Sequence, residues 1–216
     1  MKIKAAIFDM DGTILDSMGI WENLMGDYLV EKGYAPKDDL KAKVRDLCLF
    51  QSAELVKDEY GIDEDSSKII DELNKKIENY YFYDVVAKDG AKEFLQMLED
   101  KDIKMCVATA TDRYLAEAAL KRTGLFKFFK NIFVCADMGF GKERPDIYYK
   151  AAEFMGENVD DTIVFEDAAY AVKTAVKAGF TVFGIEDKYA QSQREEIKAT
   201  AHFYISNYRE MSEYID

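Results

Sequence analysis

Short apolar runs bounded by polar residues or glycine recur along the chain, and each has the length and composition of a buried strand. Runs of this kind are typical of parallel sheets whose two faces are both covered. We predict strands at Ile3–Phe8, Ile103–Ala108, Ile132–Cys135, Thr162–Phe165, Thr181–Ile185 and Phe203–Ile205.

From residue 85 onward these runs alternate with segments that have helical periodicity. In Ala91–Asp100, the apolar residues Phe94 and Leu98 share one helical face. Residues suited to helix ends, such as Asp112 before and Gly124 after the next segment, mark where a further helix starts and stops. Strands that alternate with helices require right-handed crossovers, so we predict an α/β fold with a doubly wound, Rossmann-like parallel sheet.

Residues 17–84 depart from this alternation. Every apolar pattern in this stretch has helical spacing, as in Leu73, Ile77 and Tyr80, and no strand pattern occurs. We therefore predict an all-helical insert of residues 17–84 after the first strand. The core domain then consists of residues 1–16 and 85–216.

The charge balance narrows the partners that the protein can have. The chain of 216 residues carries 42 Asp and Glu against 29 Lys and Arg, a net charge of −13. Nucleic-acid binders and polybasic membrane-surface proteins depend on Lys and Arg, so we expect neither nucleic acid nor a membrane as partner. No apolar run reaches the roughly 18 residues of a membrane span, and no secretory signal pattern occurs. We expect a monomer in the cytoplasm, with reduced cysteines.

The segment Asp9-Met10-Asp11-Gly12-Thr13 directly follows the first predicted strand. In open α/β sheets the carboxyl ends of the strands line the ligand crevice, and the two-residue period places Asp9 and Asp11 on one side. A polar strand end followed by a turn is the alternative interpretation. The pattern Asp-x-Asp-Gly-Thr would occur in only about one shuffled chain in 200, which favours a functional site.

This pattern resembles the first motif of the haloacid dehalogenase superfamily of phosphotransferases. Further segments resemble the remaining motifs in order, so the resemblance covers the whole chain. Val107-Ala108-Thr109 is similar to the second motif, Lys142 before a Pro-Asp helix start to the third, and the pair Glu166-Asp167 after a strand to the fourth. The helical insert resembles the cap of the β-phosphoglucomutase-like branch.

The resemblance implies a role for each of these residues in phosphoryl transfer. Asp9 is the expected nucleophile, because a carboxylate can form an aspartyl-phosphate and divide one difficult step into two. Asp11 is the expected general acid and then general base. Thr109 and the backbone N–H groups that follow it, beginning with Ala110, are expected to bind phosphate oxygens, and Lys142 to neutralise the phosphate and the nucleophile.

A divalent cation is expected beside these groups. A dianionic phosphate next to Asp9, Glu166 and Asp167 would otherwise meet about three like charges, and Mg²⁺ prefers oxygen ligands of this kind. Asp9, the backbone carbonyl of Asp11 and Asp167 are the expected ligands, with Glu166 close by or bound through water. The alternative, in which Glu166 and Asp167 only stabilise a helix N-terminus, loses weight once the double-Asp motif is present.

The expected function is a Mg²⁺-dependent phosphatase that acts on a small phosphorylated metabolite. The alternatives are a sugar-phosphate mutase and, in a different class, a catalytically silent module that binds a phosphorylated ligand. The mutases that the chain resembles have a histidine soon after the first motif, whereas the only histidine here is His202, for which we expect a structural role. Arg45 could meet the substrate or form a salt bridge on the cap.

The chain departs from the family pattern at several positions. Glu143 follows the third-motif lysine, where proline is usual, and Ala110 follows Thr109, where phosphatases often have asparagine. Neither change removes a group with a chemical role, so these departures leave the substrate preference open.

Overall fold

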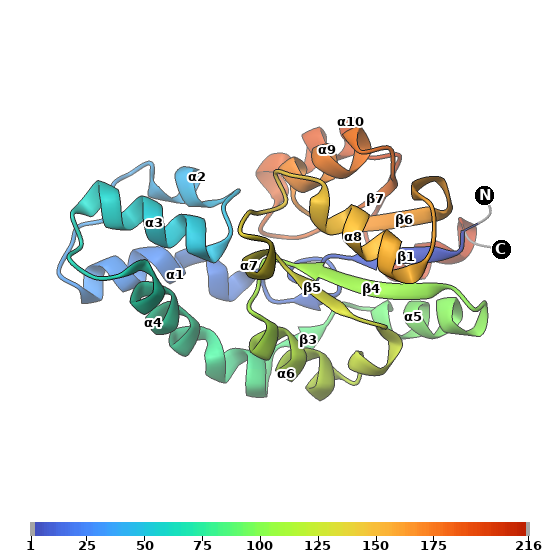
Figure 1. Cartoon of the computed structure of the whole chain (residues 1–216), viewed down its shortest axis with the longest axis horizontal. Helices are drawn as coiled ribbons and strands as arrows, with labels where there is room; N and C mark the ends of the chain where they lie inside the picture. The colour runs from blue at the N-terminus through green and yellow to red at the C-terminus, as the bar shows by residue number, and fades with distance from the viewer. Residues whose placement is uncertain (1–2, 215–216) are drawn as a thin grey trace.

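The six predicted strands form one parallel sheet in the computed structural model, which describes residues 3–214 (Figure 1). The strand order is β5-β4-β1-β6-β7-β8, so β1 lies in the middle. The strands are β1 (Ala5–Phe8), β4 (Lys104–Thr109), β5 (Ile132–Val134), β6 (Thr162–Glu166), β7 (Thr181–Ile185) and β8 (Phe203–Ile205). The predicted strands and parallel sheet are confirmed, with the ends of β1, β4, β5 and β6 displaced by one or two residues from those predicted. β5 ends one residue early because Cys135 begins a short helix.

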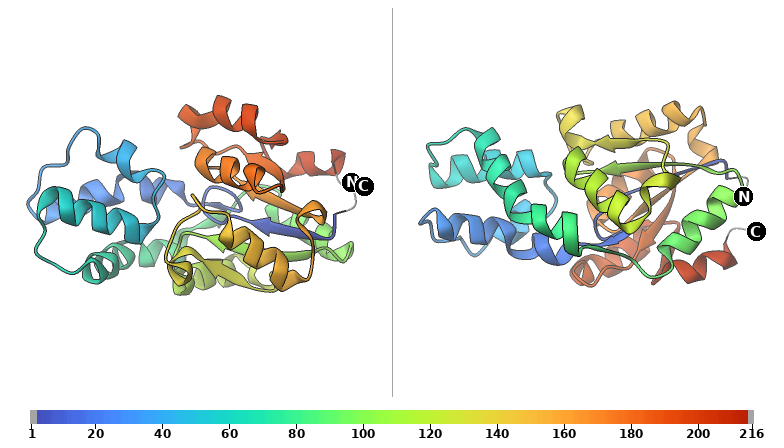
Figure 2. Two further views of the ribbon diagram at one scale, coloured as in Figure 1. Left: turned by 45° about the horizontal axis from the view of Figure 1, so that its top comes forward. Right: turned by 90° about the horizontal axis from the view of Figure 1, so that it is seen from below.

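Helices cover both faces of this sheet, which confirms the doubly wound arrangement (Figures 1 and 2). Alternate residues of β1 point to opposite faces, as the strand period requires. Ala6 and Phe8 pack with one group of helices, and Ala5 and Ile7 with the other. The first group is α5 (Ala91–Asp100) and α6 (Arg113–Thr123), and the second is α8 (Asp146–Met155), α9 (Ala169–Lys177) and α10 (Arg194–Thr200).

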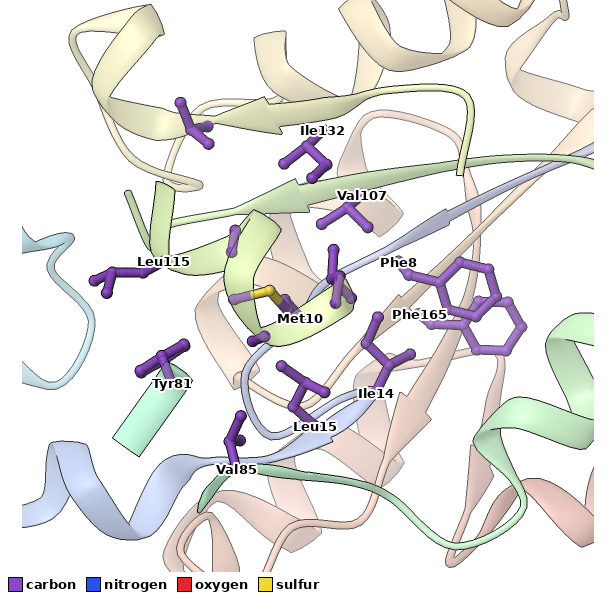
Figure 3. Close-up of a cluster of buried hydrophobic side chains, with 14 of the residues drawn as sticks. Phe8, Met10, Ile14, Leu15, Tyr81, Val85, Val107, Leu115, Ile132 and Phe165 are labelled. Carbon is purple, nitrogen blue, oxygen red and sulfur yellow. The ribbon is translucent and has the colours of Figure 1, made fainter. Parts of the chain in front are cut away.

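Aromatic side chains hold the central strand in place. Phe8 of β1 stacks on Phe165 of β6 with ring centroids 4.5 Å apart (Figure 3). Phe94 of α5 meets Phe165 edge to face at 5.4 Å. Each of the three side chains is buried. Because large apolar area and preferred ring geometries both favour this packing, the strand end that carries Asp9 is anchored to its neighbours.

Residues 17–84 are helical, as predicted, and lie beyond the carboxyl ends of the strands (Figure 1). A π-helical turn, η1, closes the segment before the chain returns to the sheet. The elements are α1 (Met18–Glu31), α2 (Leu40–Val44), α3 (Leu49–Tyr60), α4 (Ser66–Asn79) and η1 (Tyr80–Asp84).

A small antiparallel ribbon joins the two crossing points between this segment and the sheet. Its strands are β2 (Leu15–Asp16) and β3 (Val86–Ala87), which pair directly. Sequence reasoning missed both, because two residues are too few to display a strand period. The division into a core domain and a cap domain stays a prediction, and residues 1–2 and 215–216 of the predicted core lie outside the described residues.

The remaining elements are short and connect the larger ones. They are η2 (Phe126–Phe128), α7 (Cys135–Met138), η3 (Val159–Asp161), η4 (Gln191–Gln193) and η5 (Tyr208–Glu213). Cys48, Cys106 and Cys135 are buried free thiols. Within residues 3–214, none of the helices combines the length and the apolar character needed to cross a bilayer.

Candidate active site

The carboxyl ends of the central strands bring together residues that lie far apart in the sequence. Asp9 follows β1, Glu166 ends the neighbouring strand β6, and Thr109 ends β4 on the other side of β1. A cavity of about 750 Å³ opens at this edge. Its lining combines Asp9, Asp11, Lys142, Glu166 and Asp167 with side chains from α1, α2 and α3.

A buried lysine joins two of the carboxylates. The Nζ atom of Lys142 donates to Oδ1 of Asp9 and, at 2.7 Å, to Oε1 of Glu166. Burial by itself lowers the pKa of Lys142, but the charges of Asp9 and Glu166 outweigh it and hold this pKa well above its usual range. Lys142 therefore stays a cation, and it places one positive charge against Asp9 inside the cavity.

Three buried carboxylates form a group that fits a metal ion. Asp9, Glu166 and Asp167 each offer an oxygen, and these oxygens all lie within 4.8 Å of one another. Oδ2 of Asp9 is buried and has no hydrogen-bond partner. Burial and the charges of Asp9 and Glu166 raise the pKa of Asp167 well above its ordinary range. An oxygen-binding divalent cation such as Mg²⁺ would use the free oxygen and offset the crowded charge.

Gly12 is required for this group to assemble. Its φ is +79°, which side chains rarely adopt, and a Cβ atom placed there would lie 2.2 Å from Oδ2 of Asp167. The hydroxyl of the next residue, Thr13, donates to Oδ1 of Asp167 at 3.1 Å. The turn after β1 thus holds the Asp167 carboxylate against the Asp9 strand end.

Asp11 lies on the cavity wall outside this group of three carboxylates. Its side chain accepts hydrogen bonds from the hydroxyls of Ser17 and Thr111, both at 2.6 Å, and from the hydroxyl of Tyr81. Burial, and then the charge of Asp9, raise the pKa of Asp11 above its ordinary value. A raised pKa favours the protonated form that a general acid requires.

The residues of the second predicted motif differ in whether they reach the cavity. Thr109 is fully buried, and its hydroxyl oxygen accepts the backbone N–H of Thr111 at 3.0 Å. Among the described residues, the cavity lining includes Ala110 and Thr111 but not Thr109. The phosphate-binding roles of Thr109 and Ala110 stay predictions. Thr111 was missed, although its place two residues after a strand-end threonine could have indicated it.

Other residues at the site were also missed by sequence reasoning. Asp187 follows β7, is buried in the cavity lining and pairs with Lys88 at 2.9 Å. Its place after a strand end was an available signal. The hydroxyl of Tyr148 donates to Oε1 of Glu166 at 2.7 Å. Tyr148 and Tyr81 lie inside helical segments, where nothing in the sequence distinguishes them from ordinary packing residues.

Arg45 and His202 lie in different surroundings. Arg45 is exposed and lines the cavity, and none of the ion pairs within residues 3–214 includes it. His202 lies beside β7, where its Nδ1 accepts the backbone N–H of Val182 at 3.2 Å. That bond gives His202 a structural role at the β7–β8 edge of the sheet.

The buried carboxylates make the stability of the metal-free protein depend on pH. Burial raises the pKa of Glu166 from 4.5 to about 7, so the folded chain holds a proton there that the unfolded chain releases. The contribution of this proton to the free energy of unfolding is fully present below the pKa that Glu166 has in the unfolded chain. It is lost as the pH rises through the pKa of Glu166 in the folded chain. In EDTA, we expect the Tm to fall between about pH 5 and about pH 8, and Mg²⁺ to restore it at the higher pH.

Thermal denaturation followed by circular dichroism measures this effect. Glu166→Gln cannot bind the proton, so its Tm should fall less over the same range. Glu195→Gln, whose side chain is 88% exposed, serves as the control and should behave as the unchanged protein. A Tm in EDTA that rises steadily over this range in the unchanged protein would contradict the expectation.

Comparisons with known proteins agree with this geometry. Residues 6–185 match the family model described as haloacid dehalogenase-like hydrolase. The phosphorylated carbohydrates phosphatase of Thermotoga maritima is 26% identical over 191 residues, which cover 85% of each chain. Hexitol phosphatase A of Escherichia coli is 26% identical over 208 residues, 94% of this chain and 92% of its own.

The fold is also found among solved structures. CbbY from Rhodobacter sphaeroides, determined in complex with phosphate, superimposes with a TM-score of 0.83 and 17% identity. The match covers 97% of this chain and 96% of that one. At this level of identity the likeness concerns the fold alone.

Proposed function

The chain belongs to the haloacid dehalogenase-like hydrolases, and from that premise we propose that it is a Mg²⁺-dependent phosphatase of a small phosphorylated metabolite. The relatives named above are phosphatases, one of phosphorylated carbohydrates and one of hexitols by name, so a phosphorylated carbohydrate or similar compound is the proposed substrate. We also propose that the protein is a monomer and that it works in the cytoplasm.

The arrangement of Asp9 carries this proposal. One of its oxygens is bound to Lys142 and the other is buried without a hydrogen-bond partner at the cavity. Asp11, by contrast, has hydroxyl donors on both of its oxygens. Lys142 places a positive charge against Asp9 beside the cavity, where a nucleophile would meet phosphorus, and hydroxyl partners hold Asp11 in place, as a general acid requires, so the two carboxyls suit different roles.

The reaction then proceeds in two proposed steps. Asp9 attacks phosphorus, the bond from phosphorus to the leaving oxygen breaks, and Asp11 gives that oxygen a proton. A water molecule next attacks phosphorus of the aspartyl-phosphate and gives a proton to Asp11, the bond from phosphorus to Asp9 breaks, and phosphate leaves. Lys142 keeps its positive charge against Asp9 throughout. Mg²⁺ held by Asp9, Glu166 and Asp167 would supply further positive charge beside the phosphoryl group.

Residues 17–84 are proposed to act as a mobile cap over this site. The cavity is lined by both the strand ends and helices α1 to α3, and the chain crosses between the two parts only at the β2–β3 ribbon. Lids of this kind exclude water and carry substrate contacts. Structures with and without a phosphate mimic that have the same core–cap geometry, with the site open in both, would count against a mobile cap.

Glu143 links this cap to the loop that carries Lys142. Its Oε1 accepts from Nε2 of Gln51 in α3 at 3.0 Å and from the backbone N–H of Gly141 at 3.1 Å. Glu143→Ala removes the link, so we expect KM for p-nitrophenyl phosphate to rise about two- to tenfold, the range of one exposed hydrogen bond, with kcat changed less.

A double-mutant cycle isolates this contact. Gln51→Ala should raise KM similarly, and combining it with Glu143→Ala should add little, because the two side chains share one bond. The control is Glu153→Ala, an exposed glutamate on α8, which should leave KM unchanged. Strictly additive effects of the two substitutions would rule out the link.

The function is tested first with p-nitrophenyl phosphate, in Mg²⁺ and in EDTA, and then with a panel of sugar and hexitol phosphates. We expect phosphate release that depends on Mg²⁺. A protein that binds inorganic phosphate but hydrolyses none of these esters is a binding module instead.

The mutase alternative is tested separately. β-Glucose 1-phosphate is supplied with a trace of the 1,6-bisphosphate, and glucose 6-phosphate is compared with free phosphate. The position of His202 at the β7–β8 edge favours hydrolysis, because no histidine among the described residues lines the cavity. Isomer formation that exceeds phosphate release would overturn the phosphatase proposal.

A further inference from the structure

The two carboxyl oxygens of Asp11 have unequal partners. Oδ1 accepts from the hydroxyl of Ser17 at 2.6 Å and from the hydroxyl of Tyr81. Oδ2 is bonded to the hydroxyl of Thr111 at 2.6 Å. Asp11 and Thr111 both line the cavity. The two oxygens therefore differ in their capacity to hold and release a proton.

Trp21 fixes the direction in which the Tyr81 hydroxyl points. The indole N–H of Trp21 can only donate, and it lies 2.8 Å from the Tyr81 oxygen. That oxygen is thus an acceptor toward Trp21, and the single hydroxyl hydrogen of Tyr81 is left for Oδ1 of Asp11. Tyr81 is fully buried, and the indole packs edge-on against its ring with centroids 6.3 Å apart, so the Tyr81 ring is held in place.

A proton on Asp11 must then reside on Oδ2. Trp21 keeps the Tyr81 hydrogen on Oδ1, so a further hydrogen on Oδ1 would meet it. The Thr111 hydroxyl beside Oδ2 can accept as well as donate, so it tolerates both the protonated and the ionised carboxyl.

We propose that Trp21 and Tyr81 are positioning residues which select Oδ2 of Asp11 as the atom that exchanges the proton with the leaving group. The inference rests on the proposed phosphatase function. Neither residue touches the reacting atoms. Both act by setting the orientation of the Asp11 carboxyl.

Trp21 and Tyr81 both belong to the helical segment, so they connect the general acid Asp11 to the cap. Trp21 belongs to α1, at the start of the helical segment, and Tyr81 to η1, at its end (Figure 3 labels Tyr81). Trp21 also lines the cavity, as Asp11 does. The orientation of Asp11 therefore depends on how residues 17–84 are seated on the sheet.

The test compares two substrates that differ in their need for a proton. As the bond from phosphorus to the ester oxygen breaks and the bond to Asp9 forms, the proton passes from Oδ2 of Asp11 to that oxygen. Phenolate is a poor leaving group and requires the proton, whereas p-nitrophenolate leaves without it. The quantity to compare is kcat/KM, which reports the steps up to departure of the phenol.

Tyr81→Phe should lower kcat/KM for phenyl phosphate by about ten- to a hundredfold, the scale of a misplaced catalytic group. For p-nitrophenyl phosphate the loss should stay within about threefold, because the first step no longer needs the acid. Trp21→Phe should change the ratio of the two values in the same direction. A general loss of structure would instead lower both values together.

Tyr80→Phe is the matched control, since Tyr80 is the neighbouring tyrosine in η1 and donates to the backbone carbonyl of Asp16 at 2.9 Å. It should leave the substrate ratio unchanged. Trp21 is the only tryptophan, so its fluorescence reports the bond directly. The emission should shift in Tyr81→Phe and stay unchanged in Tyr80→Phe.

The outcomes separate this inference from the function on which it rests. If the unchanged protein hydrolyses neither ester in Mg²⁺, the proposed function is overturned, and the positioning roles with it. If it hydrolyses both, and Tyr81→Phe lowers both values equally or neither, the inference alone is overturned. A selective loss on phenyl phosphate with a shifted emission supports it.

Discussion

Replacing Asp9 by asparagine is expected to lower kcat by about 10⁴-fold or more, the scale on which an enzyme loses a nucleophile. An amide cannot form the aspartyl-phosphate, although it occupies nearly the same volume as the carboxyl. The fold should be retained, because the substitution removes one negative charge from the group formed with Glu166 and Asp167, and Lys142 keeps its bond to Glu166.

Phosphate release from p-nitrophenyl phosphate measures this loss, and circular dichroism checks the fold. Rapid acid quenching with mass spectrometry should locate a phosphoryl group on Asp9 in the unchanged protein and none in Asp9→Asn. Asp137→Asn is the control, since Asp137 is exposed in α7 after a neighbouring strand and pairs with Arg113. Normal turnover by Asp9→Asn would remove Asp9 from the nucleophile role.

The second large effect is expected from Lys142→Met, which leaves Asp9 and Glu166 buried without their cation. Lys142 is 2% exposed and bonded to both carboxyls. Removing one partner of a buried ion pair typically costs about 3–5 kcal/mol, because the remaining charge is neither solvated nor paired. Methionine occupies a similar space, so the expected loss reflects the charge more than a cavity.

Chemical denaturation in EDTA at about pH 8 and about pH 5 measures this cost. Without Lys142 the pKa of Glu166 loses the charge that lowers it most, and only the hydrogen bond from Tyr148 still lowers it, so the protonated form gains weight and the destabilisation should shrink at the lower pH. Lys121→Met is the control. Lys121 is exposed and pairs with Glu117 along α6, and such a pair contributes under about 1 kcal/mol.

A Lys142→Met protein as stable as the unchanged one at about pH 8 would show that the buried cation does not support the fold. Activity offers an independent readout. Loss of the positive charge beside Asp9 should lower kcat by about 10²–10³-fold, as does loss of one electrostatic group in an active site.

The strands and the main chemical motif can be predicted from local sequence alone. Each buried strand is a short local run, and the parallel sheet follows from the alternation of such runs with helices. Asp9 and Asp11 stand out because two carboxyls, a glycine and a strand end fall within a few consecutive residues. Lys142, Glu166 and Asp167 are weaker signals singly, and only their order along the chain relative to the first motif makes them candidates.

The partners of these residues cannot be predicted in the same way. Tyr81 lies 70 positions from Asp11, and Tyr148 lies 18 positions from Glu166, inside helices where their spacing matches ordinary packing. The spacing of apolar residues indicates which face of a helix is buried, but not which residues that face contacts. The β2–β3 ribbon cannot be predicted for a related reason, because a two-residue strand is recognised only by its pairing with the other strand.

The sequence by itself determined which elements form and which acids stand at the strand ends, because both depend on contiguous residues. Only the tertiary structure decided the pairings: Lys142 between Asp9 and Glu166, and Tyr81 with Trp21 on Asp11. These pairings arise because parallel strands β1, β4 and β6 end at one edge and the helical segment returns to the same edge. Burial at that edge strengthens hydrogen bonds and the interactions between charges. Long-range packing therefore sets the chemistry of residues that the sequence alone identifies only as candidates.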